Sequence, residues 1–207
     1  MVSGGQMSNK FPLIKVHQWL QSWDLADYSE SNLPRPADHF FMGSMPIAEL
    51  RRLAGVSRRQ VSEDRALGGA GYQRAHEVER SGKIARYMKW GFPVSSSSGI
   101  KPEDHRHLVH PGWLPTAILV NIIKPGEKRR RHGKSLSLKP ENAISIDESR
   151  GGLHYLTVPD ASANVSASLE PLEIIDGQHR IFAVDELGDV NGEYEVPVVF
   201  FNGLTNS

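Results

Sequence analysis

The sequence predicts one mixed domain of strands and helices, of the α/β or α+β class, for three reasons. Apolar runs of strand length alternate with helix-like stretches over most of the chain. Hydrophobic residues make up 39% of the 207 residues and charged residues 23%, which is enough apolar material for a core. A chain of this length is expected to form one domain, here residues 11–204, preceded by a flexible tail over residues 1–10.

The first part of the domain is predicted to hold two short strands and two helices. Phe11–Leu20 alternates loosely between apolar and polar residues, and Phe40–Met42 is a short apolar run, both typical of strands. Ser44 is expected to cap a helix that Gly55 ends. Tyr72–Trp90 is expected to form a second, longer helix.

The later part is predicted to hold a long loop, five strands and one helix. Residues 91–112 are rich in Ser and Pro, and a loop of that length is usually functional or mobile. A basic loop is expected over Lys124–Lys139, a hairpin tip over residues 159–168, and a helix over Gln178–Leu187 that Gly188 ends. The predicted strands are Trp113–Ile123, Ala143–Ile146, Leu153–Val158, Leu172–Ile175 and Val196–Phe201.

Composition excludes several classes of protein. The chain has no cysteine, which excludes disulfide scaffolds, thiol catalysis and cysteine-based zinc sites. The longest apolar run begins at Ala117 and is interrupted at Asn121, far short of the roughly 20 residues of a membrane helix, so no membrane partner is expected. The first residues lack the pattern of a secretory signal, and we expect a cytoplasmic location.

The segment Asp176–Arg180 is the best candidate site. A buried strand is predicted to stop at Asp176-Gly177, where glycine permits a positive φ or the close approach of another group. The helix that follows presents unpaired backbone N–H groups, which favour an anion. Arg180 adds a planar cationic fork for phosphate oxygens, and His179 can donate a hydrogen bond or exchange a proton. Asp176 can hold a metal-bound water or cap the helix. The simpler alternative is a capping Asp176 with His179 and Arg180 as surface residues.

This pentapeptide, Asp176-Gly177-Gln178-His179-Arg180, resembles the signature of the DGQHR-domain family. That family includes the DndB and DpdB proteins, encoded beside bacterial DNA phosphorothioate and 7-deazaguanine modification genes. Other segments follow in the family's order across most of residues 11–204. GYQRAHEVERSGKIARYM is similar to the family's Gln-Arg segment and helix, HFFMGSMPIAELRRLAGV to its early strand and helix, and TAILVNII and VPVVFFNGL to two later strands.

The resemblance implies a fold and a binding site. The family is related to the ParB and sulfiredoxin superfamily, which implies a small mixed sheet with flanking helices and a nucleotide-phosphate site at the signature turn. Gln178 stands where sulfiredoxin has its nucleophilic cysteine, so sulfiredoxin chemistry is excluded. The residues that would bind the nucleotide are Gly177, Gln178, His179, Arg180, Gln73 and Arg74.

The resemblance also implies an activity. The expected cofactor is ATP or another nucleotide, with Mg²⁺ organised by Asp176 and proton transfer by His179, which makes these two the expected catalytic residues. The expected function is nucleotide binding, with ATP hydrolysis as the candidate activity, in a bacterial DNA-modification or phage-defence system. DNA and other proteins of such a system are the expected partners. The resemblance is also compatible with assembly of this chain into an oligomer. Family members continue into a C-terminal helical region, which a domain ending at residue 204 is expected to lack.

A basic patch is the candidate contact with DNA. Lys128, Arg129, Arg130 and Arg131 follow one another on a chain whose formal net charge is zero. Such a patch can contact a DNA backbone without reading its sequence, and the alternative is a solvated loop. A second hypothesis, which the resemblance to DndB implies, is a DNA-binding transcriptional regulator of the modification genes without hydrolase activity, in which the Asp176–Arg180 turn is structural or contacts DNA phosphate. A third is an interaction module within a larger complex.

Two further patterns favour no site. Gly133-Lys134-Ser135 lacks both the spacing and the following helix of a phosphate loop. No acidic partner or helix fixes the spacing of His105, His107 and His110, which lie in a predicted loop.

Overall fold

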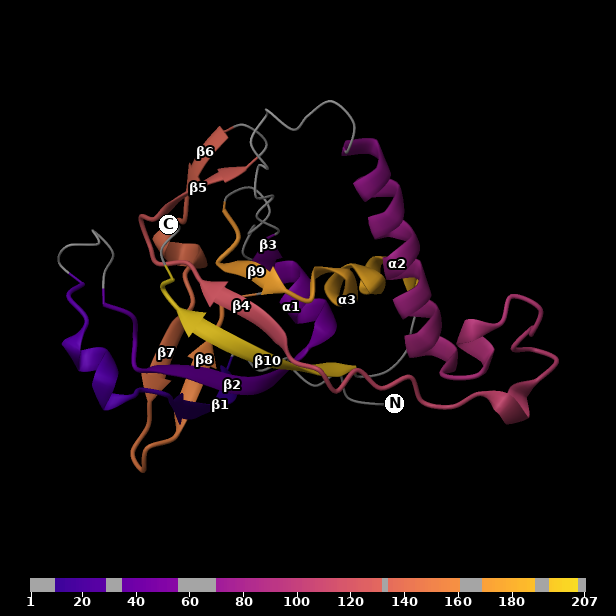
Figure 1. Cartoon of the computed structure of the whole chain (residues 1–207), viewed down its shortest axis with the longest axis horizontal. Coiled ribbons are helices and arrows are strands. Elements are labelled where there is room, and N and C mark those ends of the chain that lie inside the picture. The colour runs from indigo at the N-terminus through magenta and orange to yellow at the C-terminus, as the bar shows by residue number, and fades with distance from the viewer. Residues whose placement is uncertain are drawn as a thin grey trace.

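The computed structural model describes residues 10–28, 35–55, 70–131, 134–160, 169–188 and 194–204, and the side chains of residues 70–78, 130 and 131 lie outside that description. Within these ranges the chain forms an α+β fold around an eight-stranded mixed sheet (Figure 1). The predicted fold class is thus confirmed, but the expected small sheet is wrong. The sheet is large because the strands near residues 10–17 and 145–157 extend it on one side.

The strands follow the order β3-β9-β4-β10-β2-β1-β8-β7 across the sheet. β10 runs parallel to β4 and β3 runs parallel to β9, while the other neighbouring pairs are antiparallel. Asp176, the last residue of β9, pairs with Leu119 near the start of β4, so the candidate turn lies beside the chain that enters β4. The strands are β1 (Lys10–His17), β2 (His39–Pro46), β3 (Ala54–Gly55), β4 (Ile118–Ile122), β7 (Ser145–Glu148), β8 (His154–Thr157), β9 (Leu172–Asp176) and β10 (Glu195–Asn202).

Two predicted connections are wrong. The basic segment is not a loop: β5 (Lys128–Arg131) and β6 (Lys134–Ser137) form a separate antiparallel pair. The many charged residues of this segment concealed the two strands from sequence analysis. In the structure, Leu136 packs against a small cluster of buried residues, Ile123, Leu138 and Leu169. The expected hairpin between β8 and β9 does not exist, because these strands are not neighbours in the sheet. Residues 161–168 of its expected tip lie outside the described part of the chain.

The helices agree with the predictions except at their ends. α1 (Ile47–Leu53) begins after Pro46, not after Ser44. Ser44 remains in β2, because this strand pairs with β10 as far as Pro46, and its hydroxyl donates to the Glu195 carboxylate at 2.6 Å. The remaining helices are α2 (Ala70–Trp90) and α3 (Gln178–Phe182), which continues as a 3-10 turn over Ala183–Glu186. No helix in the described ranges is long and apolar enough to cross a membrane.

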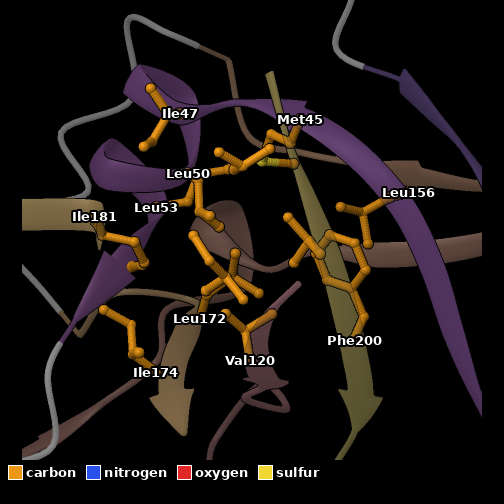
Figure 2. Packing of buried hydrophobic residues seen from close by; sticks show 14 of the residues in the cluster. Met45, Ile47, Leu50, Leu53, Val120, Leu156, Leu172, Ile174, Ile181 and Phe200 are labelled. Carbon is orange, nitrogen blue, oxygen red and sulfur yellow. The ribbon is translucent and has the colours of Figure 1, made fainter. Parts of the chain in front are cut away.

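The core lies between the sheet and the helices α1 and α3. Figure 2 shows Leu50 and Leu53 of α1 directed toward Leu172 and Phe200 of the sheet, with Ile181 of α3 at the side of the same cluster. All of these side chains are fully buried. Burial of each contributes roughly 1.5–3 kcal/mol relative to exposure. The packing of Ile181 fixes α3, and with it the turn that precedes this helix.

Candidate functional site

The turn between β9 and α3 requires glycine. Gly177 has φ of 94° and ψ of 12°, in the left-handed region, and its carbonyl accepts the N–H groups of Arg180 and Ile181 at 3.0 and 3.2 Å. A Cβ on Gly177 would lie 3.0 Å from Nη2 of Arg180 and 3.1 Å from a side-chain carbon of Ile118. Both reasons for a glycine here, positive φ and close approach, are therefore confirmed.

The guanidinium group of Arg180 lies over this turn. Its Nη1 donates to the carbonyl oxygen of Thr116, and its Nη2 lies 3.3 Å from Oδ2 of Asp176. The Arg180 side chain is 15% exposed, whereas that of Asp176 is 69% exposed. Arg180 is thus directed toward the turn and held by the backbone that enters β4, with an exposed carboxylate beside it.

The alternative in which Asp176 caps the helix is wrong. Gly177 occupies the N-cap position of α3, and no side chain makes a capping hydrogen bond there. Because α3 is only five residues long, its dipole adds little to anion binding. The fixed cation of Arg180 is the stronger attraction for an anion at this turn.

Other residues predicted for the site lie around this group. Gln178 and His179 are half-buried in the first turn of α3. Gln73 and Arg74 belong to α2, which packs against α3, but their side chains lie outside the description. Among the described residues, no group of His, Asp and Glu side chains has the arrangement of a metal site.

The loop after α2 is held by the side chain of Arg86. Its Nη2 donates to the carbonyls of Val94, Ser97 and Ile100 at 3.1, 2.8 and 3.4 Å. A Cβ on Gly91 would lie 2.3 Å from the carbonyl oxygen of His110, so the two ends of this loop meet. The two ends of the predicted long loop therefore lie in contact, and hydrogen bonds to its carbonyls hold the loop together.

The chain that leaves this loop forms an apolar hollow, which we call the Trp113 hollow. It is lined by Pro111–Pro115, Met88, Tyr194 and Glu195 and has a volume of about 560 Å³. The hydroxyl of Tyr194 donates to the carbonyl of Gly112 at 2.6 Å, and burial, followed by the nearby Tyr87, raises the pKa of Tyr194. The sequence signal that could have indicated the Trp113 hollow is the run Pro111-Gly112-Trp113.

The basic patch is divided by the structure. Arg129 is buried, with Nη2 at 2.9 Å from Glu127 and Nε at 3.4 Å from Glu173, so the expectation that it contacts DNA is wrong. Its side chain points inward because it neutralises two carboxylates under the β5–β6 pair. Lys128 and Lys134 are exposed on that pair. The side chains of Arg130 and Arg131 lie outside the described residues.

Comparison with protein-family models, with curated proteins and with solved structures finds no significant match to this chain.

Proposed function

We propose that this protein binds a nucleotide through the Asp176–Arg180 turn and acts in a bacterial DNA-modification or phage-defence system. The observation that carries the proposal is the Arg180 guanidinium, which is fixed over the left-handed Gly177 by the Thr116 carbonyl. A guanidinium that is already positioned loses little freedom when it binds phosphate oxygens. The resemblance of this segment to the DGQHR signature supports the choice of a nucleotide and of DNA as the setting.

The neighbouring residues give the site its chemistry. The Asp176 carboxylate now occupies part of the hydrogen-bonding capacity of Arg180, so an incoming phosphate replaces it or binds beside it. Freed from that contact, Asp176 is placed to hold Mg²⁺ or a Mg²⁺-bound water, which would neutralise phosphate charge. His179, one residue before Arg180, is the candidate for proton transfer if ATP is hydrolysed.

Thermal unfolding with a panel of ATP, GTP, CTP and UTP, each with and without Mg²⁺, tests this proposal. A nucleotide present at 100 times its Kd stabilises the folded protein by about 2.7 kcal/mol. For a chain of this size, the midpoint then rises by roughly 5–11 °C. The absence of a shift with every nucleotide would contradict the proposal.

A second candidate function is a DNA-binding regulator of the modification genes. The exposed Lys128 and Lys134 on the β5–β6 pair favour it, because adjacent strands place both cations on one projecting element (Figure 1). Such a regulator would bind DNA in a salt-dependent manner, and Arg180→Gln would weaken that binding without changing the response to nucleotides. In either case we place the protein in the cytoplasm, with DNA and other modification or defence proteins as partners.

A further inference from the structure

We propose that the Trp113 hollow holds the base of the nucleotide whose phosphates bind at the Asp176–Arg180 turn. This inference rests on the proposed function and extends it to the part of the ligand that the turn does not contact. Four features support it: the support beneath Trp113, the exposure of its indole, the connection to Arg180, and the carboxylate of Glu195.

The backbone that carries Trp113 is held in place. A Cβ on Gly112 would lie 1.8 Å from the carbonyl oxygen of Tyr87, so the loop here touches the backbone of α2. The Tyr194 hydroxyl donates to the Gly112 carbonyl at 2.6 Å. The backbone that leads into Trp113 therefore needs little ordering when a ligand arrives.

The indole of Trp113 is accessible to a ligand at the edge of the Trp113 hollow. It is 74% exposed, although it borders a hollow with Met88, Leu114 and two prolines in its walls. A single exposed aromatic residue is ordinary on a protein surface. An exposed indole at the edge of an apolar hollow offers one face for stacking a planar ring, and nucleobases stack on such faces.

The hollow and the turn are connected through Arg180. The guanidinium donates to the carbonyl of Thr116, the residue that follows Pro115 of the hollow. Three extended residues span at most about 11 Å, so Trp113 lies within that distance of Thr116 along the backbone. A mononucleotide with its base on Trp113 can therefore direct its phosphates toward Arg180.

Glu195 gives the hollow a preference among bases. Its carboxylate accepts the Ser44 hydroxyl at 2.6 Å and, as an exposed group with two oxygens, keeps further acceptor capacity. It can accept a hydrogen bond from the exocyclic amino group of adenine, guanine or cytosine. Uracil has no such group, so we expect UTP to bind more weakly than ATP.

Calorimetry on the full chain with ATP, UTP and inorganic tripolyphosphate tests the inference. Trp113→Ala should lower ATP affinity about 5- to 150-fold while leaving tripolyphosphate affinity unchanged. Trp113→Phe, which keeps a ring, should retain most of the ATP affinity. Trp23→Ala removes another indole, which is 44% exposed and lies in the 3-10 turn Gln21–Leu25. This variant should bind ATP and tripolyphosphate with unchanged affinity.

The outcomes separate this inference from the proposed function. If tripolyphosphate binds and Trp113→Ala leaves ATP affinity unchanged, the hollow does not hold the base, although the phosphate site stands. If ATP and tripolyphosphate bind the original protein equally well, the inference also fails. If neither ligand binds, the inference and the proposed function fail together. The unfolding midpoint of each variant verifies that it is folded.

Discussion

Replacement of Arg129 by Met tests how the structure divides the basic patch. Arg129 is the only cation that the structure places in contact with both Glu127 and Glu173 within the described residues. It also donates to the carbonyl of Leu204, whose backbone N–H is bound by Asn121. Removal of the guanidinium would leave two carboxylates beneath the β5–β6 pair without their positive partner.

The expected cost follows from burial. The side chain of Arg129 is 6% exposed, that of Glu173 is 9% exposed and that of Glu127 is 24% exposed, so water replaces little of the lost contact with Glu173. Breaking a buried ion pair by removing one partner costs about 3–5 kcal/mol. In a chain of this size, that loss lowers the unfolding midpoint by roughly 6–20 °C.

Thermal and urea unfolding measure this effect, with two controls. Lys83→Met removes one member of an exposed pair with Glu79, whose side chains are 72% and 60% exposed, and should cost no more than about 0.5 kcal/mol. Adding Glu127→Gln and Glu173→Gln to Arg129→Met removes the unpaired charges and should recover most of the stability. A midpoint for Arg129→Met equal to that of the Lys83→Met control would refute the reasoning.

Four further predictions concern the site and its surroundings. Gly177→Ala should cost about 1–3 kcal/mol in urea unfolding, because a Cβ is strained at positive φ, and an unchanged midpoint would contradict this. Asp176→Asn should increase the affinity for tripolyphosphate in EDTA but decrease the affinity for ATP with Mg²⁺. If calorimetry shows that both affinities change in the same direction, Asp176 does not hold Mg²⁺. Lys128→Gln should weaken DNA binding equally across sequences and reduce the salt slope by about 1 in titrations, whereas a sequence-dependent loss would indicate base contact. Burial raises the pKa of Tyr194 above 10.0, so the stability it contributes is fully present below pH 10 and is lost as pH rises through the higher folded-state pKa. Tyr194→Phe should therefore show a shallower loss of stability above pH 10, and an identical alkaline profile would argue against this.

Much of the fold could be predicted from the sequence because its strands are short apolar runs with clear ends. The predicted Val196–Phe201 and Leu172–Ile175 coincide closely with β10 and β9. The sheet order could not be predicted, because it depends on pairings between distant segments, such as β10 beside both β2 and β4. The strands β5 and β6 were concealed by charge, and their side chains at Lys128, Lys134, Ser135 and Ser137 lie in solvent.

The sequence indicates which residues lie at the candidate site, but it does not indicate which groups they contact. The sequence indicates a sharp turn at Gly177 and a cation at Arg180, and both are found there. It does not reveal that Arg180 bonds the Thr116 carbonyl, because Thr116 is distant in sequence and contributes only its backbone. For the same reason, consecutive basic residues did not show that Arg129 turns inward while Lys128 remains exposed.

The most direct test of the account is calorimetric titration of tripolyphosphate into the full chain and into Arg180→Gln. A charged hydrogen-bonding group contributes about 1.5–3 kcal/mol, so the variant should bind roughly 10- to 150-fold more weakly. Arg51→Gln, which removes another guanidinium paired with a carboxylate, that of Asp185 at 2.9 Å, should bind as the original protein does. If Arg180→Gln binds tripolyphosphate as tightly as the original protein, or if the original protein does not bind it, the turn is not a phosphate site.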